Sequence, residues 1–179
     1  MKLTKNEKVV LNSLIEDGRM SDADIARKLK ISLQGVRKIR QKLEQNGVIK
    51  SYKASVDYEK IGITTFAIAM LKISPEAWEK FGGRKVNQRL MQTNVIKFYR
   101  IPRGEISHIL IYGFRNMNEL NHFFQVMQEQ QSKFIEIVKI YSFSNESFGK
   151  KSVDDLIKFV LDDRNNDKLP KPENLENGS

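Results

Sequence analysis

The sequence has 179 residues, of which 40% are apolar and 30% are charged, a composition typical of a soluble globular protein with one medium or two small domains. It contains no cysteine and two widely separated histidines, which excludes disulfides and thiolate chemistry and leads us to expect no metal and no cofactor. The formal net charge is +9, and residues 1–60 hold 14 Lys and Arg against 8 Asp and Glu, which favours an anionic partner such as nucleic acid or a membrane surface.

The first residues, MKLTKNEKVVLNSL, contain no pattern typical of a secretion signal, and no apolar run in the sequence is long enough to span a bilayer. We therefore expect a cytoplasmic protein without a membrane partner. Apolar residues at helical spacing predict a first helix over residues 5–16, which the glycine of EDGR ends. A second helix is expected to begin at Ser21, because Asp24 follows it at the spacing of a capping box.

Only three or four residues separate the second helix from a third, which is expected to begin at Ser32. This spacing makes the two helices cross steeply, as in a helix-turn-helix. In the stretch SLQGVRKIRQKLEQNGVI, residues 32–49, Val36, Ile39 and Leu43 are expected to pack inward, which leaves a basic face outward. A charged face of this kind often does no more than keep a helix soluble. Its place on the second helix of a helix-turn-helix favours contact with the major groove of DNA.

The outward side chains suit that contact. Arg37 can donate two hydrogen bonds to guanine, glutamine amides can pair with adenine or phosphate, and Ser32 at the helix N-terminus can hold a phosphate oxygen. Gly35 allows close backbone approach, and Gly47 turns the chain into an extended basic stretch that is expected to form a wing. The predicted DNA-binding residues are Ser32, Gln34, Gly35, Arg37, Lys38, Gln41, Lys42, Lys50 and Lys53.

After Gly62 the pattern changes from helical to strand-like. TTFAIAMLKI predicts a strand covered on both faces, and SPEAWEKF begins a helix that is interrupted at two glycines and continues in RKVNQRLMQ. VIKFYRIP and ISHILIYGF predict two strands joined by a tight turn at RGE, and a helix over NMNELNHFFQVMQEQ precedes a last strand, FIEIVKIYSFS. The order β-α-β-β-α-β is the ferredoxin-like arrangement.

SVDDLIKFVLDD predicts one more helix, with Ser152 and Asp155 as a capping signal and an apolar stripe at Val153, Leu156 (or Ile157) and Val160. The remaining RNNDKLPKPENLENGS is polar and without periodicity, so we expect it to be disordered. The predicted fold is therefore α+β, with a winged helix-turn-helix in residues 1–60, a ferredoxin-like βαββαβ domain in residues 61–148, and a C-terminal helix and tail in residues 149–179.

The stretch LTKNEKVVLNSLIEDGRMSDADIARKLKISLQGVRKIRQKLEQNGVIKSY, followed by a βαββαβ unit, resembles the Lrp/AsnC (feast/famine) family of archaeal and bacterial transcription regulators over about residues 3–145. The resemblance implies a homodimer whose α/β domains pair through their sheets, with higher oligomers common. It places two recognition helices in successive major grooves of double-stranded DNA, about 34 Å apart. It also implies a small-molecule effector, such as an amino acid, held at subunit contacts of the dimerisation domain.

Family members that bind amino acids usually carry a glycine followed by Asp, and an aromatic–Asp pair, between the second and third strands. This chain reads IPRGEISHIL, in which Gly104 matches, Glu105 replaces the Asp and the aromatic–Asp pair is absent. Arg103, Gly104 and Glu105 are the candidate effector-binding residues, and the alternative is that they only make the hairpin turn.

We therefore expect a DNA-binding transcription regulator, not an enzyme. One alternative is an enzyme on the same scaffold, similar to tetrapyrrole decarboxylases, in which Arg100 or His108 would act. A second is an architectural protein that coats DNA without sequence preference. No nucleophile triad, paired carboxylates or phosphate-binding loop is visible in the sequence, and His108 is expected to be a packed structural residue.

Overall fold

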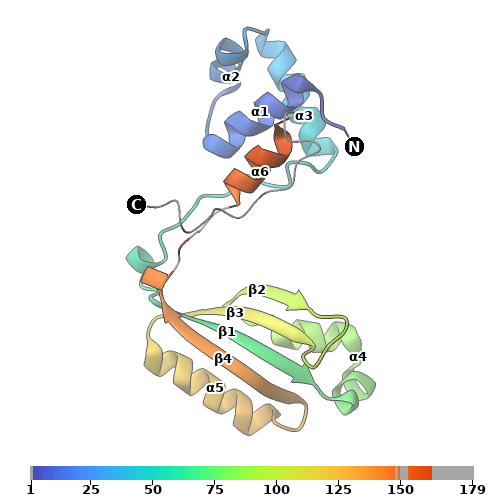
Figure 1. Ribbon diagram of the computed structural model, residues 1–179, viewed down its shortest axis with the longest axis vertical. Helices are drawn as coiled ribbons and strands as arrows, with labels where there is room; N and C mark the ends of the chain where they lie inside the picture. Colours follow the sequence, from blue (N-terminus) through green and yellow to red (C-terminus); the bar gives the residue numbers. More distant parts are fainter. Residues whose placement is uncertain (1, 148, 150–152, 163–179) are drawn as a thin grey trace, which may run out of the picture. The chain divides into compact units, whose positions relative to one another are not determined.

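The computed structural model describes residues 2–147, 149 and 153–162. These residues separate into two compact units, one formed by residues 2–55 with 153–162 and the other by residues 56–147 with 149 (Figure 1). Among the described residues, no helix has the length and apolar character needed to cross a membrane.

Three helices near the N-terminus form most of the first unit, and they match the predicted ranges: α1 (Lys5–Glu16), α2 (Asp22–Leu29) and α3 (Leu33–Gln45). Each begins after a hydroxyl side chain, Thr4, Ser21 or Ser32, that accepts a backbone N–H of the first turn. Such caps satisfy amide groups that have no partner inside the helix. Lys30 ends α2 with φ of 54°, a left-handed conformation that turns the chain toward α3 within two residues.

The first unit has its own apolar core. Val10 of α1, Ile25 of α2, and Val36 and Leu43 of α3 are fully buried, and Ile39 packs against them at the edge. Burial of each such side chain contributes about 1.5–3 kcal/mol. The inward face of α3 is therefore the one that the apolar spacing predicted, and the helix-turn-helix is confirmed.

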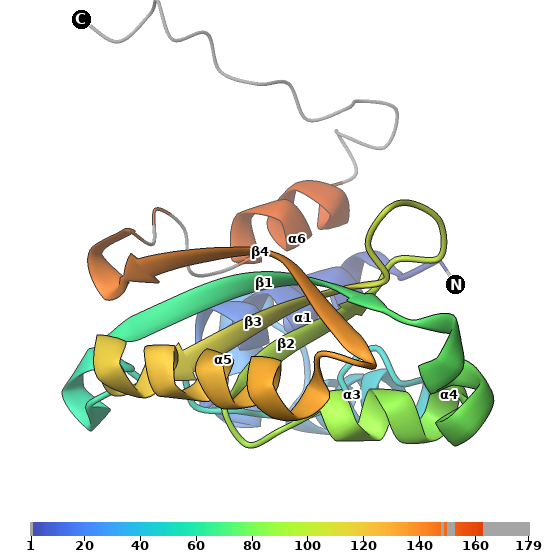
Figure 2. The same ribbon diagram turned by 90° about the horizontal axis from the view of Figure 1, so that it is seen from below.

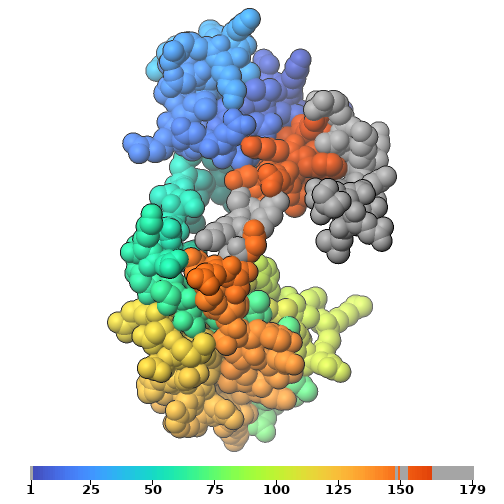
Figure 3. All heavy atoms as spheres, turned by 60° about the vertical axis from the view of Figure 1, so that its left-hand side comes forward, coloured from blue at the N-terminus to red at the C-terminus, as the bar shows by residue number. Residues whose placement is uncertain are grey.

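The C-terminal helix α6 (Asp154–Leu161) belongs to the same unit and packs on α1. Figure 3 shows its orange-red atoms against the blue atoms of the N-terminal helices. Lys158 Nζ lies 3.6 Å from the carboxylate of Glu16, which also lies 3.1 Å from Lys28 Nζ of α2. Glu16 therefore joins three helices of the unit.

Most of the apolar stripe predicted to bury α6 is exposed, and only the alternative Ile157 is half-buried. Val153, Leu156 and Val160 are 61%, 54% and 63% exposed, whereas Leu161 lies beside α1 and Ile157 is half-buried. Almost every position of this short helix except its aspartates and Lys158 is apolar, so helical spacing alone could not select the packed side. The expected cap, Ser152, lies outside the described residues.

The segment predicted to form the wing, residues 48–57, follows α3 directly and contains no paired strand in this structure. Gly47 has φ of 67°, and the N–H groups of Val48 and Ile49 then bond back to the Leu43 carbonyl, at 2.9 and 3.1 Å. The described part of the first unit offers no other strand with which a hairpin could pair. Lys50 and Lys53 therefore lie on irregular, exposed chain.

The second unit is a four-stranded antiparallel sheet with the strand order β2-β3-β1-β4. Two helices cover one face of this sheet (Figure 2). The elements in chain order are β1 (Thr65–Ile73), α4 (Pro75–Leu90), β2 (Val95–Arg100), β3 (His108–Phe114), α5 (Met117–Gln131) and β4 (Ile135–Ser144), with short 3-10 helices at Glu59–Ile61 and Asn145–Ser147. The predicted ferredoxin-like βαββαβ order is confirmed.

The two faces of the sheet differ. The helix-covered face is a closed core that includes Ala69, Leu71, Leu110 and Tyr112. On the other face the register aligns apolar residues across three strands, because Ile68 pairs with Ile111 and Tyr141, and Met70 pairs with Ile109. These side chains are only partly buried, or exposed in the case of Tyr141. No helix among the described residues of this unit covers them, so the sheet has an open apolar face.

The connection between β2 and β3 is longer than the tight turn expected at RGE, because it spans residues 101–107. Ser107 is bound to β1: its N–H donates to the Leu71 carbonyl at 2.9 Å and its Oγ accepts from the Ile73 N–H at 2.9 Å. The Ile101 N–H donates to the Ser107 carbonyl at 2.8 Å and closes the base of a wide loop.

The interruption of α4 lies at Gly82, one of the two glycines at which the break was predicted. Its φ of 71° and ψ of 154° are available almost only to glycine, whereas Gly83 keeps a helical conformation. A Cβ at Gly83 would meet the Trp78 ring at 3.6 Å, an ordinary contact.

We predict that Gly82→Ala lowers the free energy of unfolding by about 1–3 kcal/mol, because the new Cβ forces a strained backbone conformation. Gly83→Ala is the matched control and is expected to be neutral or slightly stabilising, since alanine favours a helix by about 1 kcal/mol over glycine. Urea unfolding followed by the fluorescence of Trp78, the single tryptophan, reports on this unit. Equal effects of the two substitutions would contradict the assignment of the kink.

Candidate nucleic-acid interface

The N-terminus of α3 is set by Ser32. Its Oγ accepts the Gly35 N–H at 3.1 Å, and a Cβ at Gly35 would stand 3.2 Å from that same oxygen. The absence of a Cβ at Gly35 therefore leaves room for the Ser32 cap, and it would also let a ligand approach the backbone closely. Both residues lie at the start of the outer face, where free N–H groups and the helix dipole attract anions.

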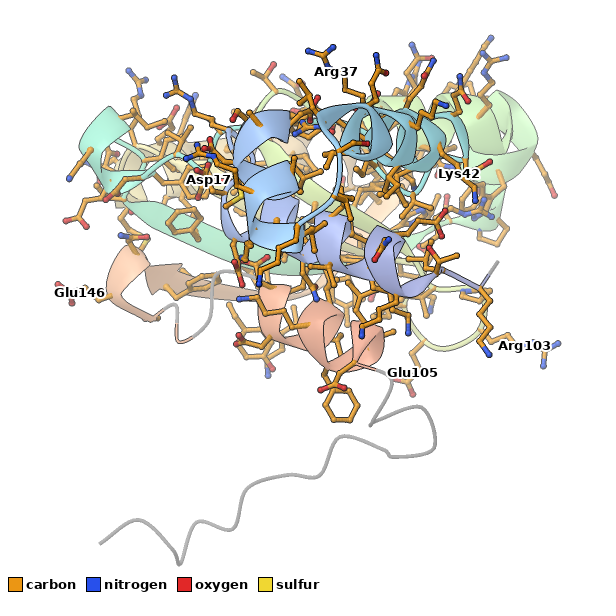
Figure 4. The ribbon with its side chains drawn as sticks, turned by 90° about the horizontal axis from the view of Figure 1, so that it is seen from above. Asp17, Arg37, Lys42, Arg103, Glu105 and Glu146 are labelled. Carbon is orange, nitrogen blue, oxygen red and sulfur yellow. The ribbon has the colours of Figure 1, made fainter. Side chains whose placement is uncertain are left out.

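Four of the predicted residues form an exposed strip along α3: Gln34, Arg37, Lys38 and Gln41. Arg37 lies on the outer side of the helices (Figure 4), and its Nε lies 4.0 Å from Oδ2 of Asp22, the first residue of α2. That contact is at the limit of an ion pair and leaves the Arg37 side chain 60% exposed. The strip therefore presents two cations and two amides to a partner.

Arg40, which is not among the predicted DNA-binding residues, has a structural position. Its Nε lies 2.7 Å from Asp22 Oδ1, an ion pair without the alignment of a hydrogen bond, and its Nη2 donates to the Met20 carbonyl at 3.0 Å. Its guanidinium also lies over the Tyr52 ring, 5.7 Å from the centroid, and the Tyr52 hydroxyl donates to Glu44 at 2.8 Å. Arg40 thus holds α3 to the start of α2 and to the chain that follows α3.

Lys42 is similarly engaged, through Glu7 of α1. The Lys42 Nζ lies 2.7 Å from the Glu7 carboxylate, although the lysine side chain is still 58% exposed. Glu7 is only 4% exposed and forms a reciprocal capping box, since it accepts the Thr4 N–H at 2.7 Å while Thr4 Oγ1 accepts the Glu7 N–H at 3.3 Å. The hydrogen bond from Lys42, and secondly that from the Thr4 N–H, lower the pKa of Glu7 from 4.5 to about 2.

These contacts revise the charge balance of α3. The near absence of carboxylates one turn away predicts a helix whose cations are unneutralised, but Asp22 and Glu7 come from other helices and neutralise Arg40 and Lys42. The sequence analysis missed Glu7, although the T-x-x-E pattern at Thr4–Glu7 is typical of a helix cap; the pairing of Glu7 with Lys42 depends on the tertiary fold.

The loop between β2 and β3 lines a second candidate site. Arg103, Gly104 and Glu105 are exposed and border a pocket of about 360 Å³ together with Trp78 and Arg100. Figure 4 shows Arg103 and Glu105 on this loop. Gly104 has φ of 136°, a conformation that favours glycine.

His108 lies behind this loop and is 1% exposed. Its Nδ1 lies 2.9 Å from Ser107 Oγ and its Nε2 lies 3.2 Å from Asn87 Oδ1, while its ring stacks on Trp78 at 5.8 Å. Burial, and less strongly the charge of Arg100, lower the pKa of His108, so the ring is neutral at neutral pH. Both ring nitrogens thus have partners, as expected for a structural histidine. Among the described residues, no cluster of His, Asp and Glu could hold a metal ion.

Comparison with known proteins assigns this interface to a class. A family model described as winged helix-turn-helix DNA-binding matches residues 3–50. An uncharacterised HTH-type transcriptional regulator of Pyrococcus furiosus is 30% identical over 127 residues, which are 69% of this chain and 80% of that protein. The HTH-type transcriptional regulator LrpC of Bacillus subtilis is 31% identical over 81 residues, which are 45% of this chain and 56% of LrpC.

Solved structures share the fold at lower sequence identity. A transcriptional regulator of Neisseria meningitidis, solved with L-methionine, is 19% identical with a TM-score of 0.71, and the match covers 86% of this chain and 96% of that one. AsnC of Escherichia coli is 14% identical with a TM-score of 0.69, over 85% and 97% of the two chains. Both matches extend over the helix-turn-helix and the α/β unit.

We predict that Glu7→Gln lowers the free energy of unfolding by about 1–3 kcal/mol at pH 7, because it removes the charge that pairs with Lys42. Since the pKa of Glu7 falls from 4.5 to about 2 on folding, this contribution is complete above pH 4.5 and is lost as the pH falls toward 2. Urea unfolding followed by far-UV circular dichroism between pH 7 and pH 3 measures the difference between the two proteins.

The control for this prediction is Glu79→Gln, at an exposed carboxylate of α4, which is expected to leave stability unchanged. A difference between wild type and Glu7→Gln that stayed constant across this pH range would show that the carboxylate charge does not stabilise the fold.

Proposed function

We propose that this chain, which belongs to the Lrp/AsnC family of DNA-binding transcription regulators, reads promoter DNA with the exposed strip of α3. The observation that carries this proposal is that the cations of α3 fall into two groups, one paired within the protein and one directed to solvent. Arg40 and Lys42 pair with carboxylates of the same unit, whereas Arg37 and Lys38 extend to solvent beside two glutamines.

In this proposal the nine predicted residues have distinct roles. Gln34, Arg37, Lys38 and Gln41 contact base edges in the major groove, with Arg37 as the donor to guanine. The Ser32 cap and the helix N-terminus bind a phosphate, and Gly35 lets the backbone approach it. Lys42, Lys50 and Lys53 contribute phosphate contacts, and Lys42 does so while it remains paired with Glu7.

We further propose a homodimer formed through the open apolar face of the sheet. Ile68, Ile109, Ile111 and Tyr141 align there across three neighbouring strands, and an uncovered apolar surface of this kind is typical of an interface between subunits. A dimer would place two α3 helices on half-sites about 34 Å apart. Higher oligomers would follow from further contacts between dimers. A regulator of this kind would act in the cytoplasm, where it meets the chromosome.

The loop pocket is the site that we propose for an effector. Its charges suit an amino acid, because the Arg103 guanidinium can bind a carboxylate and Glu105 an ammonium group. The neighbour from Neisseria meningitidis was solved with L-methionine, which supports an amino acid of this size as the first compound to test.

The enzyme alternative has less support, since both ring nitrogens of His108 are bound within the protein and the side chain is buried. The architectural alternative uses the same basic surface and differs in specificity. The DNA-binding experiment below therefore distinguishes it from specific regulation.

We predict that Arg37→Ala with Lys38→Ala weakens binding to a DNA site selected by the protein from a random pool. Loss of a bidentate base contact costs about 1–3 kcal/mol, whereas the slope of log affinity against log salt should change little, because the residues assigned to phosphate are retained. Fluorescence anisotropy at several salt concentrations measures both quantities.

The control is Arg84→Ala on α4, an exposed arginine of the other unit, which should leave affinity and salt dependence unchanged. Unchanged binding by the α3 variant would exclude α3 as the recognition helix. If wild type selected no sequence and bound all DNA equally, the architectural alternative would replace specific regulation.

We predict that Tyr141→Glu converts the dimer to monomers, because it buries a charge without a partner in the proposed interface. Asn121→Glu, on the helix-covered side of the sheet, is the control and should leave the mass unchanged. Light scattering after size-exclusion chromatography distinguishes the species. A Tyr141→Glu protein that remained dimeric would place the interface elsewhere.

A further inference from the structure

A cleft lies on the helix-covered side of the second unit, between α4 and the C-terminal end of α5, and nothing in the proposed function uses it. Its volume is about 400 Å³, which lies within the range of small-molecule sites. The floor is apolar and closely packed, because Ala77, Val86 and Leu90 of α4 are 2–5% exposed and Ile135 of β4 is 9% exposed.

The rim of the cleft is basic. Phe81 of α4 and Phe134 meet edge to face with their centroids 5.1 Å apart, and the Arg89 guanidinium lies 4.1 Å above the Phe81 ring. Lys80 Nζ lies 5.5 Å from the Phe81 ring and 5.4 Å from the Phe134 ring. Arg89, which lines the cleft, is thus held over the Phe81 ring by a cation–π contact before any ligand arrives, and Lys80 adds positive charge near the same two rings.

No aspartate or glutamate lines this cleft among the described residues. The other polar lining groups are the amides of Gln92, Gln130 and Gln131, which can hydrogen-bond a ligand but carry no charge. A bound anion would therefore neutralise Arg89, whereas a ligand ammonium group would find no charged partner in the cleft.

We infer that this cleft binds a monocarboxylate with an apolar chain. The chain would lie on the floor formed by Ala77, Val86 and Leu90, and the carboxylate would accept hydrogen bonds from the Arg89 guanidinium in a bidentate pair. This chemistry differs from that of the loop pocket, which has a carboxylate of its own at Glu105, and the two linings have only Ile73 in common. The inference goes beyond the proposed function and does not rest on it.

The test uses the full chain with octanoate as the probe, followed by NMR chemical shifts and by calorimetry. We expect a dissociation constant in about the millimolar range or below, with shifts at α4 and at the end of α5. Arg89→Gln should weaken octanoate binding by about tenfold or more, because it removes a charged bidentate donor. Arg84→Gln, at an exposed arginine on the same helix that does not line the cleft, should have no effect.

Three further probes separate the two parts of the ligand. Butyrate should bind more weakly than octanoate if the apolar floor contributes, and 1-octanol should bind more weakly if the Arg89 charge contributes. The α-amino analogue 2-aminooctanoate should bind no more tightly than octanoate, because the cleft offers no carboxylate to its ammonium group.

Arg89→Lys retains the charge and should restore part of the affinity that Arg89→Gln loses, which guards against a folding defect in the glutamine variant. Equal octanoate binding by Arg89→Gln, shifts confined to the loop over residues 101–107, or no binding up to about 10 mM would each overturn the inference. DNA binding without ligand, measured separately, is expected to be unchanged in these variants.

Discussion

The placement of α3 depends on ion pairs that this helix makes with the two helices before it. Glu7 of α1 forms an ion pair with Lys42, and Asp22 of α2 forms one with Arg40. The Glu7 side chain is almost fully buried. A buried carboxylate without its partner would be strongly unfavourable, so the pair constrains the angle at which α3 crosses α1. The apolar contacts of Val36 and Leu43 provide most of the burial, and the ion pairs add a preferred orientation.

This arrangement links the packing of the helix to its use. The cations that stabilise the unit lie on the flanks of α3, and those directed to solvent form the strip that we assign to DNA. In the second unit the sheet has a similar division, because one face is closed by α4 and α5 while the other remains apolar and open. Each unit thus buries one surface, which stabilises it, and exposes another that suits a partner: a basic strip in the first unit and an apolar sheet face in the second.

Much of this could be read from the sequence, and the exceptions have physical reasons. Caps, glycines and apolar spacing act over a few residues, so they located the helices, the βαββαβ order and the break near Gly82. The partners of Arg40 and Lys42 lie 18 and 35 positions away in the chain, beyond the reach of any local pattern. Ser107 bonds to β1, and this contact widened a predicted turn into a loop. In α6 apolar residues on nearly all sides left the packed face undetermined.

The central claim is that α3 enters the major groove with its exposed strip while Arg40 and Lys42 stay bound within the protein. Methylation protection on a DNA site selected by the full protein tests it directly, because the N7 atom of guanine lies in the major groove. The account predicts two protected clusters of guanines about one helical turn apart, near 34 Å. Protection restricted to minor-groove adenines would contradict it.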